Sequence, residues 1–479
     1  TRNHSSAASD VYKRQEVFEF QGLSGRKVTA DFSGGYLSSD AGGSLLLREL
    51  HLSSGIIARL SGCFTDYRNP LLIEHSVEEL LAQRIGGLEL GYEDLNDHDR
   101  LRHDPAVALM AGKRDVEGLR RIHEQDRGKA LAAHSTLNRL ELSAEGIDPR
   151  YKKIKPDADK IEALLIAEGV ASIPRKSSRI VLDFDATDDP LHGNQEGRFY
   201  HGYYGHYCYL PLYCFCGNIP LLAQLRPSGI DASEGTVEAL KKIVPQIRKR
   251  FGRKVQIVVR ADSGFARESI MQWCEQNKVL YCLGLARNKR LQEELQQSFE
   301  QLEKQIEQGE LSAPARCFRS FEYRTLKSWT RARRVIGKAE VLEGGRNPRF
   351  IVTNFTPRQF MARELYEDFY CARGDMENRI KEQQQDLFAD RTSTRSMAAN
   401  QLRLWFSAFA HLMLAQFQCH LLKGTRLAKA TIGTLRMLLF KIAGRVKVSC
   451  RRIHFELASA CPYRDDFAIV WKNLQAWPP

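Results

Sequence analysis

The chain has 479 residues, of which 43% are hydrophobic and 27% charged, an ordinary balance for a soluble globular protein with a sizeable core. This length is enough for two or three domains. A net charge of +13 and a pI near 9.2 favour a polyanionic partner, either nucleic acid or an anionic membrane. The 11 cysteines are scattered without a Cys-x-x-Cys pair, which predicts reduced thiols in a cytoplasmic protein.

The longest strongly apolar run extends from Leu402 to Leu422. Three ionisable side chains interrupt it, namely Arg403, His411 and His420, which favours a core helix over a membrane span. We therefore expect no membrane insertion, and nucleic acid is the better interpretation of the positive charge.

The N-terminal region, residues 16–175, is expected to be mainly helical after a short β-rich start. Residues 1–15 are polar, show no sustained periodicity and are interpreted as a non-native leader. Phe18 to Gly35 alternates like short strands. The helical part is expected to bind DNA ends or to dimerise.

Helical spacing begins near Asp40, which we expect to cap a helix through Leu50. Val77–Arg84 and Leu137–Leu142 carry further helical patterns. The polar stretch from Leu88 to His103 predicts a turn between helices. Its Asp-His-Asp trio at 97–99 is more typical of a solvated loop than of a metal site.

Ile180 to Thr187 reads Ile-Val-Leu-Asp-Phe-Asp-Ala-Thr, and its β-branched start indicates a buried strand. Because side chains alternate along a strand, Asp183 and Asp185 are expected on one face near its end. Buried carboxylates are costly without a positive partner, and hard divalent cations prefer carboxylate oxygens. The strand therefore predicts a metal site, while Asp188 and Asp189 are expected to shape the following turn.

The next elements are predicted to complete one half of a sheet. They are antiparallel strands at Tyr203–Phe215 and Leu221–Leu225, a helix at Ser233–Lys249, a strand at Val255–Phe265, a helix at Glu268–Asn277 and a strand at Leu280–Leu285. The strand at Val255–Phe265 again stops at an aspartate, Asp262, before a Ser-Gly turn. The histidines and cysteines between 192 and 216 fit no usual zinc-ligand spacing, and their aromatic neighbours favour strand packing.

Residues 291–356 change character, with a charged helix expected at Leu291–Gly309 and a β-rich, basic segment after it. Its predicted strands are Phe318–Tyr323, Arg331–Val341 and Arg349–Asn354. The basic residues there either form a solvated sheet face or contact DNA. Their density beside aromatic residues favours DNA contact, with Arg331, Arg333 and Arg334 as candidates.

The helices predicted between 357 and 425 carry Tyr370, Arg373, Glu377 and Lys381, whose spacing of three, four and four puts them on one helical face. Two strand-end aspartates and a helix glutamate can close around a metal pair that promotes in-line phosphoryl displacement. The guanidinium of Arg373 suits phosphate oxygens. Tyr370 either contacts DNA or packs in the core, and Lys381 either contacts DNA or pairs with Glu377. A short helix at Thr431–Ile442 and a basic strand pair around Val446–Leu457 form the tail, residues 426–479.

These stretches resemble the Asp, Asp and Glu motifs of DDE transposases, and best of all the insertion sequence 1380 family within the group-1 DDE class. The resemblance rests on Asp-Phe-Asp-Ala-Thr-Asp-Asp-Pro-Leu-His-Gly at 183–193, Arg-Ala-Asp-Ser-Gly-Phe at 260–265 and the Tyr-x-x-Arg-x-x-x-Glu helix. It implies an α/β fold with an RNase H-like catalytic core (176–290 and 357–425), an N-terminal mainly helical domain and a β-rich insertion (291–356) before the glutamate helix. It also implies Asp185, Asp262 and Glu377 as the catalytic and metal-binding triad, with Mg²⁺ or Mn²⁺ as cofactor.

The same resemblance implies a cut-and-paste DNA transposase of a bacterial insertion sequence, located in the cytoplasm with the nucleoid. Its partners are the inverted-repeat ends and target DNA, bound by a homodimer. Similar enzymes carry Lys or Arg seven residues after the glutamate, where this chain has Gln384, and Lys381 is the candidate replacement. Two alternatives stay open: an RNase H-like nuclease without strand transfer, and a non-catalytic DNA-binding relic.

Overall fold

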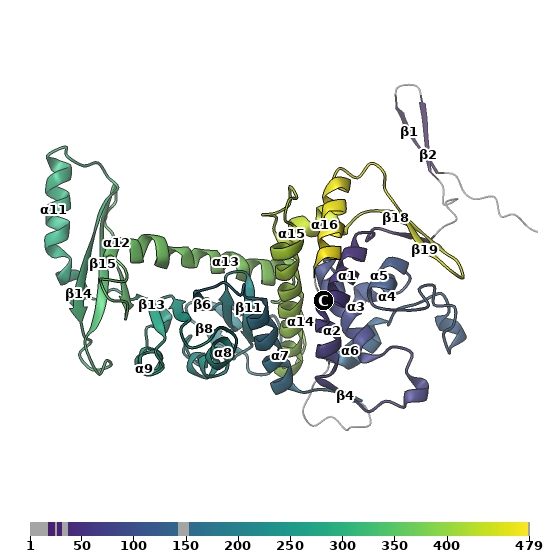
Figure 1. Cartoon of the computed structure of the whole chain (residues 1–479), viewed down its shortest axis with the longest axis horizontal. Coiled ribbons are helices and arrows are strands. Elements are labelled where there is room, and N and C mark those ends of the chain that lie inside the picture. Colours follow the sequence, from purple (N-terminus) through teal and green to yellow (C-terminus); the bar gives the residue numbers. More distant parts are fainter. Residues whose placement is uncertain (1–17, 24–25, 31–36, 142–152, 478–479) are drawn as a thin grey trace, which may run out of the picture.

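A computed structural model describes residues 18–23, 26–30, 37–141 and 153–477, so the expected leader lies outside the described residues. The fold is mixed α/β and extended along one axis (Figure 1). A large sheet occupies one part of the molecule and a helical region the other, with α14 (Met397–Gln416) between them. None of the helices in the described ranges is long and apolar enough to cross a membrane.

The main sheet has nine strands in the described part of the chain, with eight in the order β11-β10-β6-β12-β13-β17-β15-β14. Strand β6 pairs in parallel with β12, and β12 with β13, whereas the other neighbours are antiparallel. The bounds are β6 Arg179–Ala186, β10 Leu212–Cys216, β11 Ile219–Gln224, β12 Gln256–Ala261, β13 Leu280–Leu285, β14 Ala315–Tyr323, β15 Arg333–Leu342, β16 Gly345–Arg346 and β17 Arg349–Thr353. Parallel pairing brings the carboxyl ends of β6 and β12 to the same edge.

Among the strands of the main sheet, the expected order of three strands (β6, β10 and β11), helix, strand, helix and strand is present, with α8 at Thr236–Phe251 and α9 at Glu268–Gln276. The single strand expected at Tyr203–Phe215 is wrong, because it divides into β9 (His206–Tyr209) and β10 around Pro211. Strand β9 pairs instead with β7 (Asp189–Pro190) and β8 (Phe199–His201) in a separate small sheet. Strands β8 and β9 therefore form a hairpin outside the main sheet, between β6 and β10 in the sequence.

The basic β-rich segment extends the main sheet, because β17 pairs with β13. The helix expected at Leu291–Gly309 is two helices, α10 (Lys289–Glu294) and α11 (Gln296–Glu307). Helix α11 lies against β14 and β15 at the far end of the molecule (Figure 1).

The N-terminal region is helical as expected, with two differences. Helix α1 starts after Gly43 without a side-chain cap, so the expected Asp40 cap is wrong; Asp40 instead accepts a hydrogen bond from Lys441 at 3.2 Å. The expected turn at Leu88–His103 contains the end of α3 and the short helix α4. The helices are α1 Ser44–Ser54, α2 Ile56–Ser61, α3 Val77–Glu89, α4 His98–Leu101, α5 Pro105–Met110, α6 His134–Glu141 and α7 Ala158–Ser172. The short strands are β1 Phe18–Leu23, β2 Arg26–Ala30, β3 Leu37–Ser39, β4 Phe64–Asp66 and β5 Ile154–Pro156.

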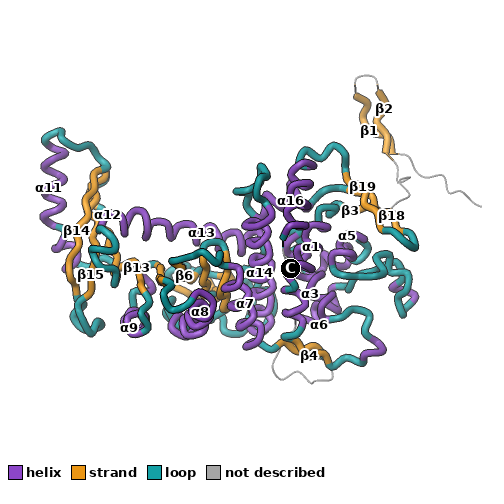
Figure 2. The backbone as a smooth tube through the Cα atoms, viewed as in Figure 1, coloured by secondary structure: helices purple, strands orange, loops and turns teal. Residues whose placement is uncertain are grey.

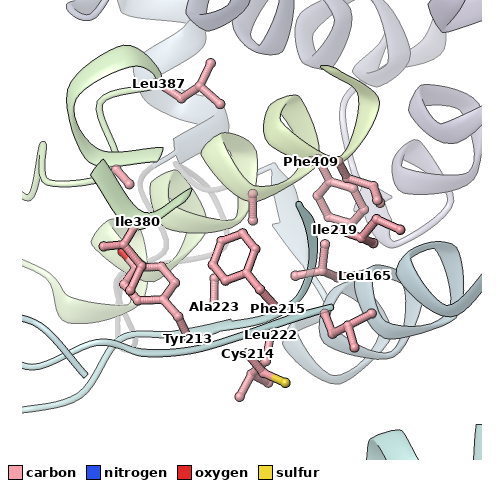
Figure 3. Packing of buried hydrophobic residues seen from close by; sticks show 14 of the residues in the cluster. Leu165, Tyr213, Cys214, Phe215, Ile219, Leu222, Ala223, Ile380, Leu387 and Phe409 are labelled. Carbon is pink, nitrogen blue, oxygen red and sulfur yellow. The ribbon is translucent and has the colours of Figure 1, made fainter. Parts of the chain in front are cut away.

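One part of the hydrophobic core lies where α14 and α7 contact β11. Phe215 and Ala223 point to the side of Phe409 on α14, while Cys214 and Leu222 point to the opposite face (Figure 3). All five side chains are buried, which explains why both faces of these strands are apolar.

The tail returns to the N-terminal region, because β18 (Gly444–Val448) pairs with both β19 (Ile453–Leu457) and β3. The expected helix at Thr431–Ile442 is present as α15 (Ile432–Leu435) and a π-helical turn (Arg436–Phe440). The final helix, α16 (Arg464–Ala476), was not expected from the sequence, although Val470 and Leu474 give it a buried face.

Candidate active site

Two aspartates lie at the ends of adjacent parallel strands. Asp185 is the penultimate residue of β6, and Asp262 follows β12 directly. The register pairs Phe184 with Ala261, so the two aspartates each come one residue later on neighbouring strands. Asp262 Oδ1 accepts a hydrogen bond from the backbone N–H of Gly264 at 2.8 Å, which fixes the Ser-Gly turn.

The helical segment that carries Glu377 runs along the main sheet (Figure 2). Along its length it contacts β14, β12 and β6 in turn. It consists of α12 (Ala362–Glu364), a π-helical turn (Leu365–Tyr370), a 3₁₀ turn (Cys371–Arg373), α13 (Gly374–Lys381) and a second π-helical turn (Glu382–Asp386). Arg373 donates to Asp185 Oδ2 at 3.2 Å and to Glu377 Oε1 at 2.9 Å. One guanidinium thus joins the first aspartate to the glutamate.

The electrostatics of this cluster are unbalanced toward negative charge. Burial raises the pKa of Asp185 to about 6, Arg373 opposes that rise, and the nearby Asp262 and Glu377 carboxylates add to it. Burial disfavours the charge of Arg373, but Asp185 and the neighbouring acidic groups hold its pKa above the usual value. The cluster can accept additional positive charge.

Tyr370 is held between the core and the active site. Burial is the main cause that raises its pKa to about 12. A Cβ built on Gly284 of β13 would lie 2.5 Å from Tyr370 Oη and 2.8 Å from the backbone N of Ser263. Glycine is therefore required at 284 for the hydroxyl to reach the turn beside Asp262. This position is compatible with both roles expected for Tyr370, contact with DNA and packing in the core.

Asp183 has a structural partner that the sequence did not reveal. Arg260 on β12 binds both oxygens of Asp183 at 2.5 and 2.8 Å and donates its third contact to the backbone carbonyl of Phe369 at 2.5 Å. Both side chains are buried. Arg260 therefore ties β6 and β12 to the helix turn directly before Tyr370 and Arg373. A lone arginine in a β-branched buried strand was the available signal.

The positions after Glu377 differ in their surroundings. Lys381 is exposed one turn beyond Glu377, and in the described ranges no hydrogen bond or ion pair joins the two. Gln384 Nε2 donates to the backbone carbonyl of Asp188 at 3.2 Å, and Asp188 Oδ2 contacts His206 Nε2 at 2.8 Å. Gln384 thus fixes the loop that follows β6.

The three arginines expected to contact DNA lie outside this cluster. Arg333 has a side chain only 1% exposed and is bonded to Glu268 and Glu275. Arg334 is buried and donates to Ser320 Oγ and to the backbone carbonyls of Phe355 and Phe360. Both guanidinium groups are therefore occupied by protein partners. Arg331, with a side chain 60% exposed, remains accessible beside Glu275.

Within the described ranges, no three His, Cys, Asp or Glu side chains already stand as a metal-binding group. The trio at 97–99 is occupied otherwise: Asp97 accepts from the backbone N–H of Asp94 at 3.2 Å, His98 contacts Gln83 Nε2 at 3.1 Å, and Asp99 contacts His134 at 2.6 Å. The donor chemistry of Asp185, Asp262 and Glu377 fits a hard divalent cation. Arg373 takes the place of a cation between Asp185 and Glu377 in this conformation.

The sequence matches the family described as Transposase DDE domain group 1 over residues 20–479. The chain belongs to this family, and it is accordingly a transposase that acts on DNA. Comparison with curated proteins gives no match. Among solved structures, the cryo-EM structure of the piggyBac transposase synaptic complex with hairpin DNA is similar, with a TM-score of 0.40 and 10% identity over 83% of this chain and 79% of that chain.

Proposed function

We propose that the chain is a cut-and-paste transposase of a bacterial insertion sequence, of the 1380 family, that acts in the cytoplasm on nucleoid DNA. Asp185, Asp262 and Glu377 form its catalytic triad. The observation that carries the proposal is the link from one strand-end aspartate through Arg373 to the helix glutamate, beside a second strand-end aspartate. The strand order β11-β10-β6-β12-β13 is proposed to be an RNase H-like core.

The metal is Mg²⁺ or Mn²⁺, held by the three triad carboxylates. When bound, divalent ions activate the attacking oxygen and stabilise the leaving oxygen of an in-line phosphoryl displacement. Burial has already raised the pKa of Asp185 to about 6, so positive charge supplied there is favourable. Once Arg373 leaves, Asp185 Oδ2 and Glu377 Oε1 have lost their guanidinium partner, while Asp185 Oδ1 still accepts from the backbone N–H of Ala186 at 2.9 Å.

Arg373 is proposed to exchange its two carboxylates for the oxygens of the scissile phosphate. A guanidinium fork binds phosphate oxygens in pairs, and its side chain is 18% exposed, so DNA can reach it. The hydroxyl of Tyr370 lies near the Ser-Gly turn that follows Asp262, and it is proposed to orient the phosphate. Exposed Lys381 and Arg331 contribute phosphate contacts that weaken as salt rises.

Arg333 and Arg334 are proposed to hold the sheet together, since both have buried protein partners. The domain layout is proposed to be the one expected from the sequence, in which the helical region of residues 16–175 binds DNA ends or a second copy and residues 426–479 form a basic tail. Two element ends in one complex require a homodimer.

The test is Mg²⁺-dependent cleavage and joining of DNA that carries the element's inverted repeats. The wild-type chain is compared with Glu377→Ala and with Glu364→Ala, which removes an exposed carboxylate from the start of the same helical segment. We expect flank release and joining by the wild type and by Glu364→Ala, with a loss of at least about 100-fold in Glu377→Ala.

Other outcomes separate the alternatives. Cleavage without joining indicates an RNase H-like nuclease. Salt-sensitive DNA binding with neither product indicates a catalytically decayed relic, and full cleavage by Glu377→Ala contradicts the triad.

A further inference from the structure

The hairpin that follows the first strand aspartate has an unusual composition. Residues 198–207 read Arg-Phe-Tyr-His-Gly-Tyr-Tyr-Gly-His-Tyr, with only aromatic residues, histidines, glycines and one arginine. No aliphatic and no acidic side chain occurs in this stretch. The hairpin comprises β8 and the start of β9, and it is here called the aromatic hairpin.

Its large side chains face solvent. Tyr203 is 88% exposed, Phe199 and Tyr200 are each 52% exposed, and Tyr207 is 43% exposed. A Cβ built on Gly202 or Gly205 would meet no atom within 4 Å, so the tip of the hairpin is open. Burying such rings is favourable, so this exposure needs a reason outside the folded monomer.

The rings lie in contact with one another. Tyr203 packs edge-on against Tyr204 at 5.1 Å, and Tyr200 against Tyr207 at 5.5 Å. The guanidinium of Arg198 lies 4.7 Å from the centre of the Tyr207 ring. Edge-on packing leaves a face of one ring in each pair available to a flat partner.

The aromatic hairpin is joined to the candidate active site. His206 Nε2 contacts Asp188 Oδ2 at 2.8 Å, three residues after Asp185. Burial raises the pKa of Tyr204 to about 12, and the Asp188 and Asp185 carboxylates contribute to that rise. The aromatic hairpin is thus tied to the loop that follows Asp185.

We propose that the aromatic hairpin is a stacking surface for unpaired DNA bases next to the bond that is cut. This rests on the proposed function and adds the form of DNA that the active site prefers. Aromatic rings interleaved with arginine bind single-stranded nucleic acid by base stacking and phosphate attraction. The stretch has no acidic side chain that would repel phosphates, and the chain as a whole carries a net charge of +13, which favours DNA as the occupant.

The experiment measures binding of two DNA probes to the full chain without divalent metal. One probe is a blunt duplex, and the other is the same duplex with a short thymine overhang that contains 2-aminopurine. Variants are Tyr203→Ala with Tyr207→Ala, the conservative pair Tyr203→Phe with Tyr207→Phe, and the distant control Tyr67→Ala, whose ring is also 62% exposed.

We expect the wild type to bind the overhang about tenfold more tightly than the blunt duplex, with quenched 2-aminopurine fluorescence. The alanine pair loses this preference and the quenching but keeps blunt-duplex affinity, whereas the phenylalanine pair and Tyr67→Ala keep all three. The preference should persist in salt that weakens binding to both probes.

Three results would overturn the inference. Equal binding of both probes by the wild type, together with normal Mg²⁺-dependent cleavage, removes the stacking surface and leaves the proposed function intact. A change of oligomeric state in the alanine pair with unchanged overhang preference makes the hairpin a contact between copies. Absence of DNA binding by the wild type contradicts the proposed function itself.

Discussion

Two arginines, Arg333 on the main sheet and Arg373 on the helical segment that carries Glu377, each join two acidic side chains, yet their surroundings differ. Arg333 on β15 donates four hydrogen bonds to Glu268 and Glu275, at 2.6, 2.8, 3.1 and 3.2 Å, and its side chain is 1% exposed. Arg373 makes one contact with each of its partners, at 3.2 and 2.9 Å, and its side chain is 18% exposed. Glu377 is 52% exposed.

The difference separates a fixed support from an exchangeable contact. Both partners of Arg333 lie on α9, so a single helix is held against β15 by every one of its bonds. The partners of Arg373 lie on different elements, β6 and α13, and one of them already faces solvent. Arg373 is reached by solvent and can exchange its contacts for phosphate oxygens, whereas Arg333, with a side chain 1% exposed, cannot give up its four bonds without opening the contact between α9 and β15.

The largest loss of folding stability is expected for Arg333→Ala. Removing the guanidinium leaves Glu268 and Glu275 without their buried partner, so the free energy of unfolding should fall by about 3–5 kcal/mol. Urea denaturation measures this loss. Arg331→Ala is the matched control, because its side chain contacts the same Glu275 but is 60% exposed, and it should change stability by less than about 1 kcal/mol.

The pH dependence of this loss sharpens the result. Burial raises the pKa of both glutamates, but the Arg333 bonds hold each net pKa below the usual value. The stability they contribute is present above the usual glutamate pKa and is lost as pH falls through the lowered values. The difference in the free energy of unfolding between the wild type and Arg333→Ala should therefore become smaller in acid. A loss of stability in Arg331→Ala as large as that in Arg333→Ala would contradict the assignment of Arg333 as the fixed support.

Arg260→Lys should cause the second-largest loss of folding stability, because Arg260 is a fixed support that lies beside the contacts of Arg373. A single ammonium cannot reach both oxygens of Asp183 and the Phe369 carbonyl, so unfolding should become about 2 kcal/mol easier. Cleavage should fall as well, since the helix turn before Arg373 loses its anchor. The control is Arg179→Lys. Arg179 is exposed, and its guanidinium lies 5.9 Å from the centre of the Phe369 ring that Arg260 also contacts, so this variant should retain cleavage.

His411 tests the core beneath the active-site strands. It is buried on α14, 5.3 Å from the Phe215 ring, and burial lowers its pKa from 6.5 to about 3. Below pH 6.5, His411 is protonated in the unfolded chain but stays neutral in the folded chain, so the free energy of unfolding decreases as the pH falls. In His411→Phe this loss should be smaller by about 1 kcal/mol per pH unit near pH 5, measured by denaturation. His454→Phe, at an exposed position, should leave the slope unchanged.

The sequence allowed the strand-end positions of Asp185 and Asp262 and the shared helix face of Arg373 and Glu377 to be predicted. Each follows from a local pattern, an apolar run that stops at a carboxylate or a helical spacing. The burial of Arg333 and Arg334 could not be predicted from a local pattern. These neighbouring residues point to opposite faces of β15, and both faces are covered, one by α9 and the other by residues 355–360.

The same reason explains the remaining differences. The Arg260 anchor joins residues 183, 260 and 369, and no local pattern connects them. High strand propensity predicts one strand over Tyr203–Phe215, which includes the second half of the aromatic hairpin. Pairing of β9 with β7 and β8 instead separates the first part of this range from the main sheet.

Arg373→Ala should have the smallest effect on folding and a large effect on function. Without the guanidinium, the pKa of Asp185 should rise further above 6, so this carboxyl takes a proton instead of remaining a buried charge. Glu377 is half exposed and keeps its water, so the free energy of unfolding should change by less than about 1 kcal/mol. DNA cleavage should nevertheless fall by at least about 100-fold, because the phosphate loses its paired donors. Arg363→Ala, an arginine 71% exposed at the start of the same helical segment, should alter neither quantity. If Arg373→Ala instead destabilises the protein as much as Arg333→Ala does, Arg373 is a fixed support, and its exchange onto DNA is contradicted.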